Sequence, residues 1–288
     1  LEGNGNYVEL IKAEDVLLGR VKLEELEEEL SSFSKIGLGF PIYGFNAPGM
    51  ILELVKLHLA PILRNTKKPE FFVYSTCAGP IYLNEIAHFR LKKELEKEGV
   101  TVDYERQFFM PANIFSAYPE DVNLLLVRTS ARKAEIMAQE LSDGWKRLRE
   151  DKYLPYFFGW IYLLERAGWK NTSRHFKVHD RCNSCGLCER NCPAGNITMK
   201  EHMVIVNEGG GPRGEVRKKP CFGKNCYICM RCIYSCPQKA IGLGMFNFAI
   251  LKNGYSIEDF LGKEVPKDLS ALEKGYLKSL RKYIEQVN

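Results

Sequence analysis

The same run of four cysteines occurs twice in the chain, each time ending in Cys-Pro, at residues 182–193 and 226–237. In both runs two residues separate the first three cysteines from one another, and three residues precede the fourth. Nine of the ten cysteines lie between residues 182 and 236, and only Cys77 lies outside. A disulfide framework would spread its cysteines along the chain, so this clustering indicates a local prosthetic group.

Runs of this spacing hold [4Fe-4S] clusters, and in two-cluster proteins the fourth cysteine of each run binds the other cluster. We assign the ligands by that precedent. The predicted first cluster takes Cys182, Cys185, Cys188 and Cys236, and the predicted second cluster takes Cys226, Cys229, Cys232 and Cys192.

Zinc is the alternative, because it also accepts four thiolates from paired Cys-x-x-Cys elements. It fits the third cysteine of each run and the Cys-Pro endings poorly. Cys221 is surplus to both sets, and we interpret it as a packed or free thiol, with a ligand role in a rearranged site as the alternative. Ile197 and Ile241 occupy matched positions after the two runs and are predicted to keep water from the clusters.

Charge and length restrict the classes of function. The chain of 288 residues is long enough for about two domains. Its net charge is +5, and residues 176–245 alone hold 11 Lys or Arg against 5 Asp or Glu. We interpret this surplus as compensation for anionic clusters, without nucleic-acid binding. A sharper alternative is that Arg217, Lys218 and Lys219 receive an acidic redox partner.

The first residues of the chain and its longest apolar stretch indicate the expected cellular compartment. The first residues lack a basic start and an apolar core, so no secretory signal is visible and a reducing cytoplasm is the expected compartment. The stretch 153–164 is shorter than the roughly 20 residues of a membrane-spanning helix, so we expect no membrane span. The preferred interpretation of this stretch is a connector between domains.

The amino-terminal half alternates between strand and helix patterns. Strands are predicted at 36–46, 70–76 and 100–110, helices at 23–33, 48–64, 82–97 and 130–150, and a short strand within 16–23. This order is typical of an α/β fold with a parallel sheet covered on both faces, in which ligands bind beyond the carboxyl ends of the strands. Near the cysteines we expect a strand at 202–207 and an exposed loop at 209–220.

Changes in composition divide the chain into four predicted parts. They are an α/β domain at 1–150, an aromatic helical connector at 151–175, a cluster domain at 176–245 and a helical tail at 246–288, with its helix from about 269 to 286.

Several segments together resemble a known family. They are the cysteine runs placed after an α/β half, the segment Phe-Pro-Ile-Tyr-Gly-Phe-Asn-Ala-Pro at 40–48, and Phe-Lys-Val-His-Asp-Arg before Cys182. These features resemble the flavodoxin-ferredoxin fusion proteins of anaerobes. The resemblance implies a flavodoxin-like doubly wound parallel sheet that binds FMN, followed by an α+β two-cluster ferredoxin-like domain. It also implies an iron-sulphur flavoprotein oxidoreductase.

Carried onto this sequence, the three flavin loops of that family fall on short segments. The phosphate loop falls on Gly3, Asn4, Gly5 and Asn6, the second loop on Pro41, Tyr43, Gly44, Phe45 and Asn46, and the third on Thr76, Cys77, Ala78 and Gly79. Tyr43 is the expected stacking partner of the flavin ring, and Gly44 allows a close approach of the backbone. The plainer interpretation is that Tyr43 and Phe45 cap the end of the sheet and that Cys77 is a buried small residue.

Three hypotheses of function follow. The first is an oxidoreductase in which electrons pass between FMN, two clusters and an external donor or acceptor, which is a small molecule or a redox protein. The second is an electron carrier that docks to a partner enzyme and has no substrate of its own. The third is a ferredoxin fused to an empty flavodoxin-like interaction domain, which Glu2 favours because its charge would repel a phosphate. No Ser-His-Asp set, pair of catalytic carboxylates or Walker loop is apparent in the sequence.

Overall fold

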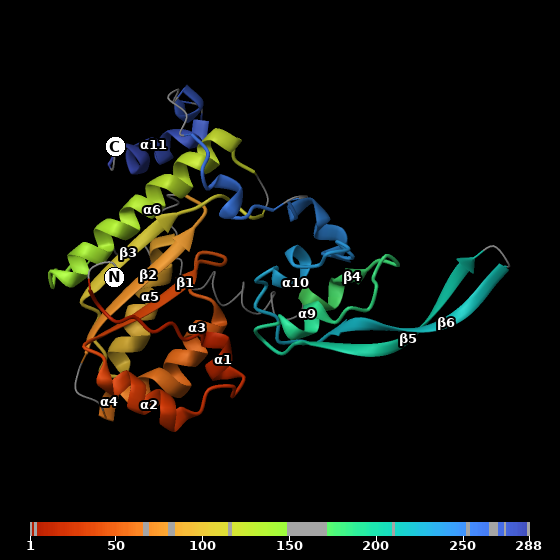
Figure 1. Ribbon diagram of the computed structural model, residues 1–288, viewed down its shortest axis with the longest axis horizontal. Helices are drawn as coiled ribbons and strands as arrows, with labels where there is room; N and C mark the ends of the chain where they lie inside the picture. Colours follow the sequence, from red (N-terminus) through yellow and green to blue (C-terminus); the bar gives the residue numbers. More distant parts are fainter. Residues whose placement is uncertain are drawn as a thin grey trace. The chain divides into compact units, whose positions relative to one another are not determined.

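The computed structural model describes residue 2 and residues 5–65, 69–79, 84–114, 117–148, 172–208, 211–251, 254–264, 270–273 and 275–286 (Figure 1). The chain forms two compact units. The first comprises Leu1–Tyr162 and Leu251–Asn288, and the second comprises Leu163–Ile250. Most of the predicted connector at 151–175, including its apolar stretch 153–164, lies outside the described residues, which resume at 172.

A three-stranded parallel sheet forms the centre of the first unit. The strands are β1 (Lys35–Pro41), β2 (Glu70–Cys77) and β3 (Tyr104–Phe109), adjacent to one another in that order. Apolar and small side chains alternate along β1, so that Ile36, Leu38 and Phe40 are buried on one face. The predicted parallel sheet is therefore confirmed. β1 and β3 are shorter than the predicted strands, whereas β2 extends one residue further, to Cys77.

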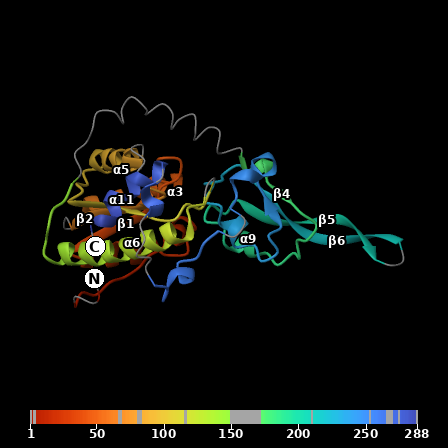
Figure 2. The ribbon, with the colours of Figure 1, turned by 90° about the horizontal axis from the view of Figure 1, so that it is seen from above.

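Helices cover both faces of this sheet (Figure 2). The elements are α1 (Ala13–Leu17), α2 (Leu23–Ser32), α3 (Gly49–Leu54), the π-helical segment η2 (Val55–Leu59), α4 (Ala60–Asn65), α5 (Glu85–Lys97) and α6 (Glu120–Ser142). On one face Phe72 and Tyr104 pack against Met137 of α6. On the other face Ser75 contacts His88 of α5. The sheet is thus enclosed, as the alternating pattern predicts.

A single proline accounts for the π-helical segment. Pro61 has no backbone N–H and cannot complete the α-helical bond to residue 57. The chain widens one turn before it, where the Ala60 N–H bonds to the Val55 carbonyl. The helix predicted over 48–64 therefore exists as three consecutive segments.

Aromatic rings of β2 lie over the glycines of β1. Gly37 pairs with Phe72 and Gly39 pairs with Tyr74, and the ring in each pair occupies the place of a glycine Cβ. The two rings are themselves stacked, with centroids 6.3 Å apart. Glycine is therefore required at both positions for the rings to cover this edge of the sheet.

We expect Gly37→Ala to lower the free energy of unfolding by about 1–3 kcal/mol, because the added methyl group displaces the Phe72 ring. Thermal unfolding measures this change. Gly214→Ala is the control, since its Cβ would meet Met203 Sδ at an ordinary 3.6 Å. Equal stability of the two variants would contradict the proposed ring packing.

The carboxyl-terminal residues divide between the two units. η5 (Gly244–Ala249) belongs to the second unit, whereas η6 (Glu258–Phe260), η7 (Ser270–Glu273), η8 (Gly275–Leu277) and α11 (Lys278–Glu285) belong to the first. Leu272, Leu280 and Ile284 are buried in one cluster with Val122 and Leu126 of α6. The tail therefore completes the apolar core on the α6 side of the sheet.

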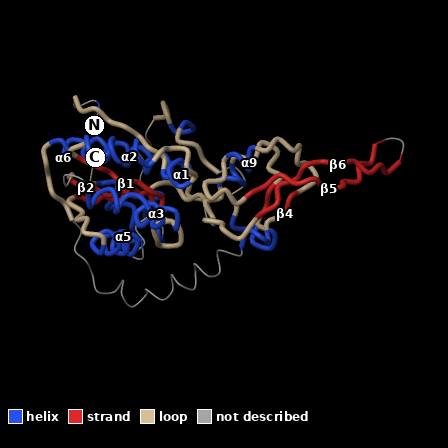
Figure 3. Tube along the Cα trace, turned by 90° about the horizontal axis from the view of Figure 1, so that it is seen from below, coloured by secondary structure: helices blue, strands red, loops and turns tan. Residues whose placement is uncertain are grey.

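The second unit consists of short elements around the cysteines and one long hairpin (Figure 3). The elements are η4 (Ser173–His175), β4 (Lys177–Val178), α9 (Leu187–Arg190), β5 (Ile197–Glu208), β6 (Gly211–Phe222), α10 (Arg231–Tyr234) and β7 (Ile241–Gly242). β4 pairs antiparallel with β7, and β5 pairs antiparallel with β6.

Four other predicted elements differ from the structure. The helix predicted from about 269 to 286 is divided into η7, η8 and α11, and only α11 is α-helical. The exposed loop predicted at 209–220 is wrong, because β6 pairs with β5 along its full length. Both strands are edge strands of a two-stranded sheet, which tolerates Pro212 and Pro220. The strand predicted within 16–23 is also wrong, since Val16 lies in α1. The helix predicted at 130–150 begins ten residues earlier, at Glu120, and ends at Ser142.

Candidate metal centre

The two cysteine runs have the same backbone conformation. Left-handed residues recur 44 positions apart, at Ser184 and Ile228, at Gly186 and Met230, and at Gly195 and Lys239. The short helices α9 and α10, which begin directly after Gly186 and Met230, are also 44 positions apart. The sequence repeat is therefore a structural repeat, and it builds two loops of matching shape.

One cavity is lined by four cysteines drawn from both runs. They are Cys182, Cys185, Cys188 and Cys236, and the lining also includes Leu187, Met199, Pro220 and Ile241. The fourth cysteine comes from the turn after α10, so the second run closes the cavity that the first run begins.

A second cavity has the reciprocal composition. Its lining includes Cys226, Cys229 and Cys232 of the second run and Cys192 of the first, together with Phe176, Pro193 and Met230. Each cavity has an empty volume of about 320 Å³ including its mouth, so the two sites are equivalent in size. The cysteines are thus grouped three and one, with the fourth exchanged between the runs.

Backbone amides point at the sulphur atoms. The N–H groups of Asn196 and Ala240 donate to Cys192 Sγ and Cys236 Sγ at 3.3 Å, again 44 positions apart. Ile228 donates to Cys226 Sγ at 3.3 Å while its φ angle is 51°. A left-handed conformation is strained for a β-branched residue, and such strain is concentrated at functional sites. Amide donors at sulphur stabilise the thiolate and raise the potential of a bound cluster.

Burial alone disfavours the thiolate form in these cavities. It raises the pKa of Cys188 and of Cys226 to about 11. Burial, with the neighbouring thiols, raises the pKa of Cys232 further. Metal ligation requires the thiolate form of each cysteine. In these buried cavities the negative charge of the thiolates is therefore stabilised by the positive charge of bound iron.

Apolar residues close the cavities, and the surplus cysteine lies apart. Ile197 and Ile241 are both buried, as predicted, and Ile241 lines the first cavity.

Cys221 lies in β6 with its Sγ 3.3 Å from Nε2 of His202, and neither cavity is lined by it. Cys221 is thus placed with the hairpin and not with the ligand sets.

The sequence analysis missed a polar network behind the second run. Ser173 is fully buried, and its Oγ donates to the Gly223 carbonyl at 2.7 Å. Asn196 accepts a bond from the N–H of Asn225 at 2.8 Å. These contacts join η4 and the start of β5 to the chain leading into Cys226. In the sequence Asn196 lies just after the first cysteine run. Nothing else in the sequence indicated that it helps to position the second run.

The second and third predicted flavin loops lie side by side in the first unit. Pro41 is in register with Thr76, and the Ile42 N–H bonds to the Thr76 carbonyl at 2.8 Å. Tyr43 and Asn46 form a tight turn through reciprocal backbone bonds, with Gly44 and Phe45 left-handed between them. Both loops lie at the carboxyl edge of the sheet.

Side chains already satisfy the carbonyls of the third loop. Tyr118 donates to the Ala78 carbonyl at 2.5 Å, and Asn84 donates to the Gly79 carbonyl at 2.9 Å. Cys77 is buried, in agreement with its plainer interpretation. A Cβ at Gly79 would meet the Tyr118 hydroxyl, so this loop is packed against its neighbours.

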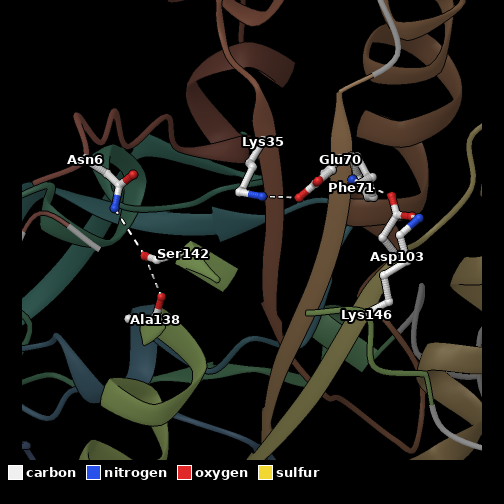
Figure 4. A network of polar contacts seen from close by, with 8 residues as sticks. All are labelled: Asn6, Lys35, Glu70, Phe71, Asp103, Ala138, Ser142 and Lys146. Carbon is white, nitrogen blue, oxygen red and sulfur yellow. Dashed lines mark hydrogen bonds and ion pairs between the residues drawn. The ribbon is translucent and has the colours of Figure 1, made fainter. Parts of the chain in front are cut away.

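The predicted phosphate loop lies at the other edge. Gly3 and Asn4 are outside the described residues, and Gly5 is left-handed in a turn. Asn6 donates to Ser142 Oγ at 3.2 Å, beside the starts of β1, β2 and β3 at Lys35, Glu70 and Asp103 (Figure 4). A seven-residue strand is roughly 20 Å long. The structure therefore does not bring Asn6 together with Tyr43 and Thr76.

Ser75, His88 and Glu105 form a buried chain of hydrogen-bonded side chains in the first unit, although no such set was apparent in the sequence. His88 Nε2 lies 2.6 Å from Ser75 Oγ, and His88 Nδ1 lies 2.9 Å from Glu105. Lys92 donates to the same carboxylate at 3.1 Å. Ser75 is completely buried, so no substrate reaches its hydroxyl. These side chains tie α5 to β2 and β3 and do not form a nucleophilic site.

The residues that the structure describes were compared with the requirements of a membrane span and of a single-ion site. No helix there is long and apolar enough to span a membrane. No three His, Cys, Asp or Glu side chains there form a group that could hold a single metal ion.

Comparison with known protein families gives one result for this site. The model of a family described as a 4Fe-4S dicluster domain matches residues 181–240, which contain all eight cavity-lining cysteines. Comparison with curated proteins gives no match, and comparison with solved structures gives none either. Residues 181–240 thus form a ferredoxin-like 4Fe-4S domain, and its role is iron-sulphur electron transfer.

Proposed function

We propose that this chain is an electron-transfer protein with two [4Fe-4S] clusters, one in each cysteine-lined cavity. The observation that carries the proposal is the composition of the two cavities, each lined by three cysteines of one run and the fourth of the other. The first cluster is held by Cys182, Cys185, Cys188 and Cys236, and the second by Cys226, Cys229, Cys232 and Cys192. This exchange of the fourth ligand is the pattern of two-cluster ferredoxins.

Clusters fit the cavities better than zinc does. A structural zinc ion requires four thiolates within about 2.3 Å of one point. The described side chains form no group that could hold a single ion. Four thiols that line a cavity suit a cluster, whose irons and sulphides fill the space between them.

The residues of the unit bind and tune the cofactor. When bound, each cluster supplies one-electron chemistry. The cysteines fix its position, and the amides of Asn196, Ile228 and Ala240 donate to ligand sulphurs. Ile241 and Met230 line the cavities with apolar surface, which excludes water and lowers the local dielectric constant.

Anaerobic purification followed by iron and acid-labile sulphide assays tests this proposal. We expect about eight irons and about eight sulphides per chain. After reduction, electron paramagnetic resonance is expected to show two interacting [4Fe-4S]⁺ centres. Stoichiometric zinc without sulphide would overturn the proposal.

A flavin oxidoreductase is the second candidate. The parallel sheet and the adjacent left-handed turns at Gly44, Phe45 and Gly79 favour it, because backbone of this kind approaches a planar ring closely. Asn6 lies at the opposite edge and does not fit the phosphate loop of the flavodoxin-ferredoxin family. Of the three predicted flavin loops, only the second and the third therefore lie together in the described residues. No step is therefore assigned to FMN.

Extraction of flavin from the same anaerobic sample decides between the candidates. One FMN per chain would establish a flavoprotein and direct the search for its small-molecule or protein partner. Eight irons without flavin would assign the chain as a ferredoxin-type carrier whose first unit serves interaction.

A further inference from the structure

The two cysteine runs match in backbone conformation but differ in the charge of the short helices that they contain. α9 and α10 begin at equivalent positions, with Leu187 in the first run and Arg231 in the second. Leu187 lines the first cavity with an apolar side chain. The equivalent place in the second run carries a guanidinium group, which is charged at every pH at which a protein is folded.

The other residues of the two helices do not cancel this difference. α9 has the sequence Leu-Cys-Glu-Arg, so that the opposite charges of Glu189 and Arg190 offset each other. α10 has the sequence Arg-Cys-Ile-Tyr, in which Arg231 is the charged residue beside the ligand cysteine. The helix of the second run therefore carries one positive charge more than the helix of the first.

The guanidinium of Arg231 contacts the turn that supplies the exchanged cysteine of the second cavity. Its Nη1 donates to the Asn191 carbonyl at 3.5 Å. Asn191 directly precedes Cys192, the cysteine that the first run contributes to this cavity. Arg231 also directly follows Met230, which lines the same cavity. Both the backbone and the side chain of Arg231 thus adjoin the second site.

The charge of Arg231 acts on a ligand cysteine of this cavity. Burial raises the pKa of Cys229, and the backbone N–H and the positive charge of Arg231 both oppose that rise. A positive charge that stabilises a thiolate also stabilises the additional negative charge of a reduced cluster, and it therefore raises the reduction potential. Arg231 is exposed, so water screens the interaction and keeps it moderate.

We propose that Arg231 raises the reduction potential of the cluster in the second cavity through the positive charge of its guanidinium group. This inference rests on the proposed iron-sulphur function. The first cluster has the uncharged Leu187 in the equivalent place, so the charge of Arg231 makes the two clusters inequivalent. An electron in the second cavity is held more strongly than it would be without Arg231.

A redox titration of the full-length holoprotein with dithionite, followed by electron paramagnetic resonance, tests the proposal. In Arg231→Gln an amide replaces the guanidinium, so that a donor to the Asn191 carbonyl is kept while the charge is removed. We expect this variant to hold the electron in the second cavity roughly tenfold more weakly, which lowers the potential of that cluster by about 59 mV. The potential of the first cluster is expected to change much less.

Three further variants assign the potentials and control the experiment. Cys192→Ala/Cys229→Ala identifies the potential of the first cluster, because only that cluster is expected to remain in it. Arg231→Lys keeps the positive charge and is expected to titrate close to the wild type. Arg132→Gln changes the net charge of the chain by the same amount at a residue of α6 in the first unit, where Arg132 is paired with Glu135 at 2.8 Å. Both of its potentials are expected to match those of the wild type.

Other results would overturn the role of Arg231 alone. Unchanged potentials in Arg231→Gln, or equal falls of both potentials, would show that its charge does not act on the second cluster in particular. An Arg231→Lys variant that titrates like Arg231→Gln would show that the charge is not the cause. A fall to about four irons in Arg231→Gln would mean that the residue holds Cys192 in place. A wild type without clusters, by iron and sulphide assay, would instead refute the proposed function itself.

Discussion

The double variant Cys192→Ala/Cys229→Ala is expected to retain about four irons per chain, whereas Cys192→Ala/Cys185→Ala is expected to retain almost none. The reason is the reciprocal lining of the two cavities. Cys192 and Cys229 line the same cavity, so their joint loss removes one cluster. Cys185 lines the other, so its loss together with Cys192 removes both.

This pair of variants separates exchanged ligands from sequential ligands. If each run held its own cluster with all four of its cysteines, the two iron contents would be reversed. Iron and sulphide assays on anaerobically purified protein measure the difference, and the spectrum of the reduced protein identifies the residual cluster. Cys221→Ser is the cysteine control, because Cys221 lies beside His202 on the hairpin. This variant is expected to retain about eight irons per chain.

Glu105→Gln is expected to lower the free energy of unfolding by about 3–5 kcal/mol. Glu105 is 1 % exposed, and its carboxylate holds both His88 and Lys92. Removal of its charge takes away the ion pair that the buried Lys92 ammonium makes with this carboxylate. Urea denaturation followed by circular dichroism measures the loss.

Two further variants test the cause of this loss. Glu94→Gln on α5, the helix that carries His88 and Lys92, breaks partly exposed ion pairs with Lys56 and Lys97 and is expected to cost less than about 1 kcal/mol. Adding Lys92→Met to Glu105→Gln is expected to recover much of the stability, because both buried charges are then absent. A Glu105→Gln variant as stable as Glu94→Gln would show that the buried network contributes little.

The elements with a strong local pattern were predictable from sequence. The strands at β1, β2 and β3 carry β-branched and aromatic residues between turn residues, and α5 carries a clear helical period, so their existence and order followed from the residues alone. β6 was not predictable, because Gly211, Pro212 and Lys218 favour a loop locally. Only pairing with β5 makes this segment a strand, and the residues of β6 by themselves do not reveal that pairing.

The predicted flavin site illustrates the same limit. A resemblance assigned three loops to one site from their order in the chain. The structure places Tyr43 and Thr76 at one edge of the sheet and Asn6 at the other, next to Ser142. Order in the chain says nothing about which end of a strand a distant loop reaches.

The sequence by itself determined the cysteine repeat and the 4Fe-4S domain, because both depend on the spacing of residues close together in the chain. It also indicated the parallel sheet, because each strand and helix has its own local pattern and their alternation is typical of that fold. The tertiary structure decided where the tail packs and that His88 and Glu105 meet inside the first unit. It also decided that Arg231 of the second cysteine run contacts Asn191 of the first. These features arise from contacts across long separations in sequence, and only folding brings such residues together.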